Sequence, residues 1–515
     1  MDSSKIKAII VATGATFIAL YLGISAATAQ LEAISWVGGA TVLLTCMLLG
    51  KRIWLLIPFL GSLQITLMVP GRPTTLLLAQ ALVVVFSLLM FLARKLPFHF
   101  RITELEFWCG LLTLCLAQVY LRNPVGINLI GGDTVGGRPY IMYAVTLVVT
   151  VIMCGLRVPP KDFHLAMKLS IMGGVINFGL GIFGWFYPWL GSWLGLNVLT
   201  QANQNAVIDE TQATRVEGTR VIAQTLSLTV ASYINPMKAC FSLRWAPLVL
   251  LSFALAASSG YRVVSGAVGL TYLVGLYYRG YLPSVLAAGL LSLIGLVFLA
   301  AGNLILPLPA NIQRSLSFLP GTWNERYTLE AETSTSWRVD IWKEVLLTDR
   351  WIQNKWLGDG LGFSAAELAM QASLGGRKGI GRVGISGFDA HREAILSNGD
   401  YHSGPVSAVR TIGYAGLLIM ALAQLRLVVH AHRQIQRCRG TEWFPVALFF
   451  CIPIVWTPVF FWFVFGAFLG DGPAILIAAG MLRMLENNLP LPAYVVARRT
   501  PYLLVAPQDR VVNVA

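Results

Sequence analysis

Two arginines and one histidine, in or beside a polar insert between apolar segments, are the side chains best suited to chemistry. They are Arg262 in Ser-Ser-Gly-Tyr-Arg, Arg338 in Ser-Trp-Arg-Val-Asp, and His402 in Tyr-His-Ser-Gly-Pro. An imidazole at a membrane interface can act as a general base near neutral pH. The planar fork of arginine bonds phosphate oxygens bidentately and keeps its charge. These residues predict a site that holds a diphosphate and activates a hydroxyl group.

Each of the three residues also has a purely structural interpretation. His402 fits a loop histidine at the level of the lipid headgroups, and Arg338 fits a solvated residue on an amphipathic helix. Arg262 has almost no loop to carry it away from the bilayer. Charged residues at membrane depth tend to mark substrate paths, although a long side chain can also reach back to the interface.

Two further arginines are weaker candidates for contacts with phosphate or sugar. Arg138 follows a Gly-rich segment with Asp133, and an ion pair that stabilises the turn is its simpler explanation. Arg220 is weaker still. Both stand in segments that we expect on the same side of the membrane as the insert.

The sequence lacks the motifs of several other site classes. It contains no Gly-x-x-x-x-Gly-Lys loop, no dinucleotide fingerprint and no serine elbow in the insert. Its seven cysteines form no Cys-x-x-Cys or metal-type spacing. We therefore expect no metal, no cofactor and no disulfide framework.

The composition predicts an all-α, polytopic membrane protein. The chain has 515 residues, of which 56% are hydrophobic and 12% charged, with a mean hydropathy of +0.68. Soluble proteins average about 25% charged residues. The net charge of +14 does not indicate nucleic acid, because the basic residues are scattered between apolar segments rather than gathered in a patch.

A membrane-spanning helix needs about 20 mostly apolar residues, and this template predicts about twelve to fourteen spans. The first is read as a retained helix rather than a cleaved leader. The predicted spans are 8–27, 34–50, 53–69, 75–93, 104–121, 139–156, 165–187, 218–237, 244–258, 263–278, 282–306, 405–428, 445–465 and 473–486.

Basic residues fix the expected orientation. With the N-terminus inside, most Lys and Arg residues between spans fall on the cytoplasmic side, as the positive-inside rule requires. We therefore place both termini in the cytoplasm and the insert 307–404 outside it. Within that insert, 325–349 predicts a helix whose apolar face carries Trp337, Ile341, Val345 and Leu346.

Five regions follow from this topology. The expected regions are N-terminal spans over 1–243, spans carrying Arg262 over 244–306, the large extracytoplasmic loop over 307–404, C-terminal spans over 405–486 and a cytoplasmic tail over 487–515.

Four short motifs, taken in order, resemble the bacterial O-antigen ligase and polysaccharide polymerase family. Arg338 is followed four residues later by Trp342, then by the glycine run Leu-Gly-Asp-Gly-Leu-Gly over 357–362. His402 ends the outer loop, and Gly-Tyr-Ala-Gly-Leu-Leu over 413–418 lies in the next span. The similarity covers mainly 244–430.

The resemblance implies a metal-independent glycosyltransferase with a GT-C-like fold in the bacterial inner membrane, active on its periplasmic face. Such enzymes transfer a glycan from an undecaprenyl diphosphate carrier to a hydroxyl of the lipid A core, of another glycan or of a protein. By motif, His402 activates the acceptor, and Arg338 and Arg262 hold the leaving diphosphate. Trp342, Arg138 and Arg220 are the accompanying substrate-binding candidates. Other polysaccharide-assembly proteins are expected partners by analogy only.

Two alternatives stay open at the level of sequence. A transporter or flippase of lipid-linked oligosaccharide predicts ionisable residues near the bilayer midplane and symmetry between halves. A scaffold for envelope assembly would use the insert as a docking surface. The apolar spans and the polar insert favour surface chemistry, and the motifs do not separate a ligase from a polymerase.

Overall fold

The computed structural model describes most of the apolar core of the chain. The described residues are 44–67, 73–125, 136–187, 191, 217–309, 312–313, 316–317, 321–362, 396, 399 and 401–490. The predicted span 8–27 and the part of the predicted tail beyond residue 490 lie outside them.

Helices make up the regular structure of the described residues, with two isolated β-bridges, Thr66 to Thr74 and Phe98 to Leu156. The helices are η1 (Gly50–Leu55), α3 (Leu56–Gly61), α4 (Thr75–Leu92), α5 (Glu104–Arg122), α6 (Arg138–Gly155), α7 (Lys161–Phe186), α10 (Glu217–Tyr233), α11 (Pro236–Cys240), α12 (Ala246–Ser258), α13 (Arg262–Ile305), α15 (Glu325–Leu347), α18 (Gly404–Cys438), α19 (Phe444–Phe463) and α20 (Phe468–Asn488).

Two compact units divide the chain. The first contains Met1–Trp54 and Leu82–Leu96, where the described parts are helical over 44–54 and over the second half of α4. The second contains Leu55–Ala81 and Pro97–Ala515. All of the candidate residues belong to the second unit.

Nine helices in the described part are long and apolar enough to cross a membrane. This confirms an all-helical, multi-pass membrane protein. The nine are Leu44–Gly61, Thr75–Leu92, Glu104–Arg122, Arg138–Gly155, Lys161–Gly184, Arg262–Ile305, Gly404–Cys438, Phe444–Phe463 and Phe468–Asn488. Within the described residues the predicted spans at 218–237 and 244–258 correspond to the shorter helices α10 and α12.

The predicted division into spans 34–50 and 53–69 is wrong over its described part. One helical run extends from Leu44 to Gly61, and Lys51 and Arg52 stay exposed within it instead of forming a loop. The run ends because Gln64 has a positive φ of 46°, after which Leu67 donates to the carbonyl of Pro73. The pairing of Leu67 with Pro73 shows that the helix does not continue to 69.

The break inside the long helix α13 agrees better with the sequence, whereas the break inside α18 was not predicted. The long element α13 has a non-helical residue at Tyr281, with φ 58° and ψ −169°, followed by Pro283. Proline removes a helical hydrogen bond and bends a helix. The two pieces correspond to the predicted spans 263–278 and 282–306. A second break, at Gly413, divides α18.

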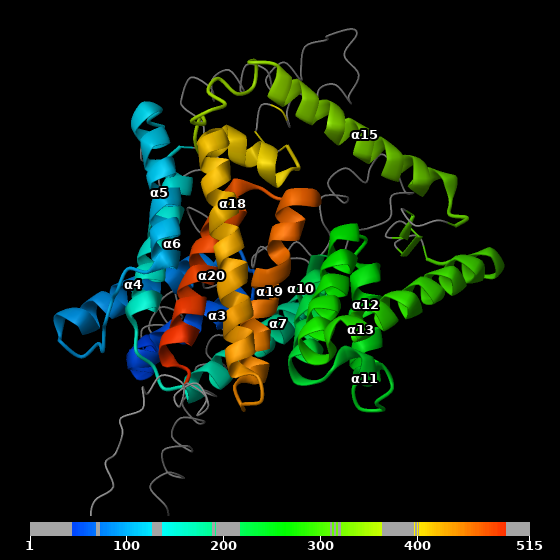
Figure 1. The fold of residues 1–515 in the computed structure, drawn as a ribbon, viewed down its shortest axis with the longest axis horizontal. Helices are drawn as coiled ribbons and strands as arrows, with labels where there is room; N and C mark the ends of the chain where they lie inside the picture. Colours follow the sequence, from blue (N-terminus) through cyan, green and yellow to red (C-terminus); the bar gives the residue numbers. More distant parts are fainter. Residues whose placement is uncertain are drawn as a thin grey trace, which may run out of the picture. The chain divides into compact units, whose positions relative to one another are not determined.

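The helices of the second unit pack in a bundle around α18, α19 and α20. Figure 1 shows α18 beside α19 and α5, and the contacts confirm both pairs as well as the packing of α20 on α6. Local signals set the helix ends: Thr103 and Glu106 form a capping box at the start of α5. In α6, α18 and α19 a proline stands in the first turn.

Candidate functional site

The helix α15 confirms the predicted apolar face of the insert. Ile341 and Val345 are fully buried, and Trp337 and Leu346 are partly buried against the same cluster. The cluster also contains Tyr401 and Val409 around the start of α18, together with Val406. Burial of this face therefore fixes α15, with Arg338 on it, against the chain that carries His402.

A loop of residues 351–362, called here the glycine loop, follows α15. Gly358, Gly360 and Gly362 have φ values of 82°, 105° and 79°, which only glycine adopts without strain. The Asp359 carboxylate accepts the backbone N–H groups of Gln353 at 2.8 Å and Asn354 at 2.9 Å. The spacing of the glycines is thus required by the backbone of the loop.

The glycine loop docks onto the break in α18. The N–H of Asp359 donates to the carbonyl of Arg410 at 2.6 Å, and the N–H of Tyr414 donates to the carbonyl of Lys355 at 2.8 Å. A Cβ on Gly358 would stand 2.6 Å from the backbone nitrogen of Gly413. The two glycine motifs of the sequence are therefore in direct backbone contact.

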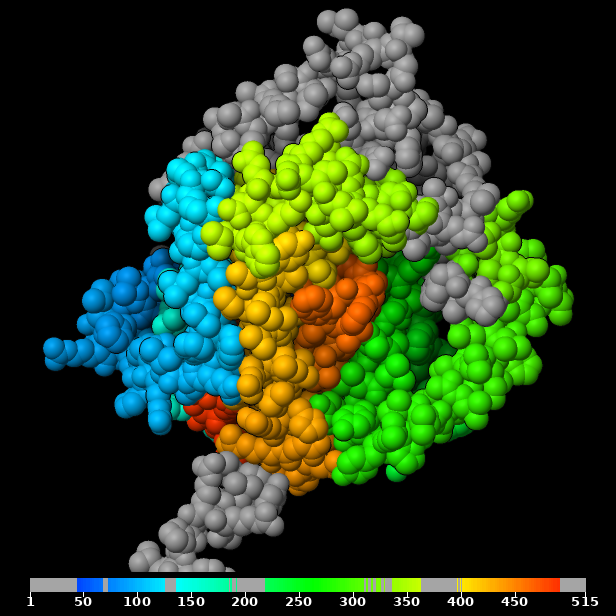
Figure 2. Space-filling model, turned by 45° about the horizontal axis from the view of Figure 1, so that its top comes forward, coloured from blue at the N-terminus to red at the C-terminus, as the bar shows by residue number. Residues whose placement is uncertain are grey.

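Helices α5 and α6 hold the other side of the glycine loop. Gln118 Nε2 donates to the carbonyl of Leu357 at 2.8 Å, and Arg122 Nη2 donates to the carbonyl of Gly358 at 2.6 Å. The Tyr140 hydroxyl accepts the N–H of Leu361 at 2.8 Å. Figure 2 shows the insert, in yellow-green, over the end of α18 and next to α5.

His402 stands directly before α18 in a constrained conformation. Its φ is 50°, a left-handed value that is uncommon for residues other than glycine. Its ring centroid lies 5.9 Å from that of Trp337 and 5.5 Å from that of Phe465. Trp342 Nε1 donates to the carbonyl of Tyr401 at 2.9 Å. Aromatic contacts and one indole bond thus fix the histidine.

The turn between α19 and α20 supports the same segment from the bundle side. The N–H of Phe468 donates to Ser407 Oγ at 3.2 Å. A Cβ on Gly466 would lie 3.0 Å from the Cα of Gly404. This turn, with Phe465, is a part of the site that the sequence analysis missed, because no local pattern links it to His402.

Arg338 is the most distinctive charge of this end. It is half-buried beside Trp337, and within the described residues its Nε has no hydrogen-bond partner. Burial lowers the pKa of this guanidinium below its usual value, because the charged form loses water. A desolvated cation with an unused donor is well suited to an anionic group.

The other predicted residues have different positions. Arg262 begins α13, and its Nη2 donates to Ser317 Oγ of the insert at 3.3 Å. Arg138 is buried at the start of α6, two residues before Tyr140, and Arg220 is exposed in the first turn of α10. Trp342 uses its indole N–H on the backbone next to His402. The contacts of the described residues therefore join Trp337 and Trp342 of α15 to the segment of His402, with Arg338 next to Trp337 in the chain. Arg262 contacts another part of the insert.

A second polar group, called here the ion-pair cluster, occupies the other end of α5. His430 Nδ1 lies 2.7 Å from Glu486 Oε1, Arg483 Nε lies 2.8 Å from Glu106 Oε1, and Arg426 Nε lies 3.1 Å from Glu104 Oε1. Arg483 also pairs with Glu486, and His430 with Glu104. Because α5 starts at this cluster and ends at the glycine loop, the two groups lie at opposite ends of that helix.

These features define a polytopic membrane protein that is helical in its described part, with His402 held next to the helix α15 that carries Arg338. Among the residues that the structure describes, no three His, Cys, Asp or Glu side chains are grouped to hold a metal ion. The sequence matches no protein-family model and no curated protein. The resemblance in the short motifs is therefore a hypothesis about function.

Proposed function

We propose that this protein transfers a glycan from an undecaprenyl diphosphate carrier to a hydroxyl acceptor, at the periplasmic face of a bacterial inner membrane. The observation that carries the proposal is the contact of the His402 ring with Trp337, the residue before Arg338 on α15. Arg338 Nε has no hydrogen-bond partner among the described residues. A base and a cation with an unused donor are what this transfer requires.

In the proposed reaction, the acceptor oxygen attacks the anomeric carbon of the first sugar while its proton passes to the His402 imidazole. The bond between that carbon and the diphosphate oxygen breaks, and the polyprenyl diphosphate leaves with the bonding electrons. Arg338 stabilises the negative charge on this leaving group, and Arg262 adds a second cation from the start of α13. The protonated imidazole then returns its proton to water.

The proposed side of the membrane follows from basic residues. The positive-inside rule favours the cytoplasm for the basic segment of His430 and Arg437, on the far half of α18, while Arg122 and Arg138 stand at the helix ends nearest the glycine loop. This arrangement agrees with an extracytoplasmic insert. The acceptor stays open among the lipid A core, a second glycan chain and a protein side chain.

A transfer assay tests the proposal. Purified protein is incubated with a labelled undecaprenyl diphosphate glycan and candidate acceptors, and products are separated by size. His402→Asn is the preferred variant, because asparagine tolerates the positive φ of this position and supplies no base. We expect a loss of at least about 100-fold in rate. One added chain would indicate a ligase, and a ladder a polymerase.

Two arginine variants test whether the charge of Arg338 matters specifically or whether any positive charge on the insert would serve. Arg338→Gln is expected to lower the rate by about 100-fold or more, as the loss of a charge-stabilising donor does. Arg350→Gln removes an exposed arginine that stacks on Trp351 in the same insert, and it should keep the rate within about twofold of wild type, as surface changes usually do. Undiminished transfer by the His402 and Arg338 variants would refute the enzyme proposal and favour transport or scaffolding.

A further inference from the structure

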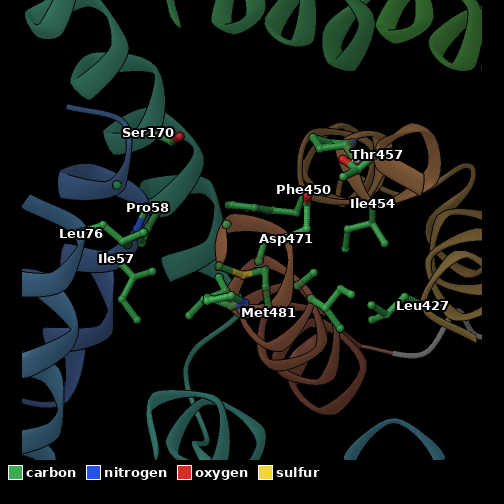
Figure 3. Close-up of a pocket in the computed structure, with 18 of the residues that line it drawn as sticks. Ile57, Pro58, Leu76, Ser170, Leu427, Phe450, Ile454, Thr457, Asp471 and Met481 are labelled. Atoms are coloured by element: carbon green, nitrogen blue, oxygen red, sulfur yellow. Dashed lines mark hydrogen bonds between the residues drawn. The ribbon is translucent and has the colours of Figure 1, made fainter. Parts of the chain in front are cut away.

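A cavity of about 480 Å³ lies within the helix bundle of the second unit, apart from the insert. Figure 3 shows Ile57, Pro58 and Leu76 on one side of it, and Leu427, Ile454 and Thr457 on the other. This volume lies in the range of about 300–1,000 Å³ that small-molecule sites have.

Most of the cavity wall is apolar, and its hydroxyl groups are already hydrogen-bonded. Ser62 and Ser170 bond to each other at 2.8 Å, and Thr457 Oγ1 donates to the carbonyl of Pro453 at 2.6 Å. Phe450 and Met481 are among the apolar side chains of the wall. A ligand therefore gains mainly by burying an apolar chain.

Three polar groups on the wall keep unused hydrogen-bonding capacity. Gln80 and Gln424 are both 4% exposed, and their carbonyl oxygens accept from Thr146 and from Trp462. Within the described residues no partner is present for either side-chain NH₂ group. Asp471 uses Oδ2 on the N–H of Ala467, which leaves Oδ1 as an acceptor.

Two of these groups, Asp471 and Gln424, give the cavity a polar end. Asp471 is in the first turn of α20, and Gln424 pairs with Trp462 near the end of α19, so both are close to the turn that supports His402. Leu427, Phe450 and Met481 lie farther along their helices. The arrangement matches a molecule with a polar head and an apolar tail.

Charge decides which head fits. Among the described residues that line the cavity, Asp471 is the one that carries a charge, and its carboxylate would repel a phosphate. A head with an O–H or N–H donor can instead bond to the carboxylate and accept from a glutamine amide. Charged groups at membrane depth are costly and typically functional.

We propose that this cavity binds a single-chain amphiphile with a hydrogen-bond-donating head, a long-chain alcohol or amine, whose head contacts Asp471 and whose chain lies along Leu427 and Met481. The site is separate from the proposed diphosphate site and does not depend on glycan transfer.

Photolabelling of the full-length protein in lipid nanodiscs tests this inference. Three probes share one long chain with a diazirine and differ only in the head, which is a hydroxyl, an ammonium or a phosphate group. Labelled peptides are quantified by mass spectrometry. We expect the alcohol and amine probes to label α19 and α20, and the phosphate probe to label them at least about tenfold less. Equal labelling by the phosphate probe, or none by any probe, would overturn the proposal.

Variants identify the head and the cavity. Asp471→Asn should lower labelling by the amine about tenfold, since a charge-assisted bond is lost, and change labelling by the alcohol less than about threefold. Asp349→Asn, at an exposed carboxylate outside the cavity, is the matched control. Ala478→Phe and Ala474→Phe fill the cavity from α20 and should abolish labelling by both probes.

Gel filtration shows which of the variants Ala478→Phe and Ala474→Phe is folded, and photolabelling is then measured on the folded variant. Labelling that persists in a folded filled variant, or an Asp471→Asn result equal to the Asp349→Asn control, overturns the site. Because the measurement contains no glycan, failure of the transfer proposal leaves it unaffected.

Discussion

The two ends of α5 use charge in opposite ways. At the ion-pair cluster, Glu104, Glu106 and Glu486 face His430, Arg426 and Arg483 at distances between 2.5 and 3.3 Å. At the insert, backbone bonds hold the glycine loop, and Arg338 keeps an Nε without a partner among the described residues. Arg426 Nε of the cluster also lacks a hydrogen bond among the described residues, but it lies 3.1 Å from a Glu104 oxygen, whereas those residues give Arg338 no ion pair. Paired charges stabilise the bundle, whereas a half-buried cation without a counter-charge is typical of a site that binds an anion.

The largest expected effect comes from the backbone of the insert end. Gly413→Ala places a side chain on a residue with φ 72°, and the new Cβ would overlap the carbonyl of Trp356. We expect a loss of about 3 kcal/mol or more, from left-handed strain and overpacking together. Thermal unfolding followed by tryptophan fluorescence measures it.

Gly440→Ala is the control for that prediction. Gly440 has a φ of 76° and open space at its Cβ position, so it carries strain without overlap. Gly440→Ala should lower the free energy of unfolding by about 1 kcal/mol. Equal losses in the two variants would show that docking of the glycine loop contributes nothing.

The ion-pair cluster should give the next largest effect. Glu486→Gln removes the carboxylate that pairs with both His430 and Arg483, while the two cations stay in place. Removing one partner of a buried pair costs about 3 kcal/mol. The exposed pair of Asp349 with Lys355 is the comparison, and Asp349→Asn should cost no more than about 0.5 kcal/mol. Similar losses would mean that the cluster has no structural role.

Trp342→Phe should affect rate more than stability. It deletes the indole bond to the carbonyl of Tyr401, at a cost of about 1 kcal/mol. If His402 is the base, we expect kcat to fall about tenfold with KM for the donor nearly unchanged, since positioning is lost and binding is kept. Trp351→Phe deletes a comparable bond to Glu344 and should leave kcat unchanged.

The smallest effect concerns Tyr401. Its hydroxyl is buried without a partner among the described residues, and burial raises the pKa of this phenol to about 12. In the unfolded chain the tyrosine side chain ionises near pH 10. The contribution of Tyr401 to stability is therefore complete below about pH 10 and is lost as pH rises toward 12. The free energy of unfolding of Tyr401→Phe should equal that of wild type or exceed it by up to about 1 kcal/mol. Its decrease at alkaline pH should be smaller than in wild type. Unfolding curves from pH 8 to 11 test it, with exposed Tyr187→Phe as the control that keeps the wild-type slope.

Local patterns in the sequence predicted much of the fold. The apolar spacing over 325–349 gave the buried positions Ile341 and Val345 correctly, because a helix repeats every 3.6 residues. The pair of spans around Tyr281 was also anticipated. Lys51 and Arg52 were misread as a loop, since exposed charges within a helix and charges in a turn look alike in sequence.

The candidate site was less accessible to sequence reasoning. The sequence selected His402, Arg338 and Trp342, and the structure brings Trp342 to the backbone next to His402, but the contact of His402 with Phe465 joins segments that no local pattern relates. Arg122 was not selected from the sequence, although it donates to the carbonyl of Gly358. Asp471 and the cavity were missed for the same reason, since they arise from packing between distant helices.

The break in α18 has a consequence for the order of folding. In an uninterrupted helix the carbonyl of Arg410 would accept the N–H of Tyr414; here Asp359 donates to that carbonyl, and Lys355 accepts the N–H of Tyr414. The glycine loop thus supplies the hydrogen-bond partners that the interrupted helix lacks, and each segment needs the other to pair these backbone groups. Contacts between segments distant in sequence form late, and amides that open together form one cooperative unit. We expect the amides of Asp359 and Tyr414 to exchange with solvent at a common rate, so that His402 acquires its position only when the loop and the helix close as a single step.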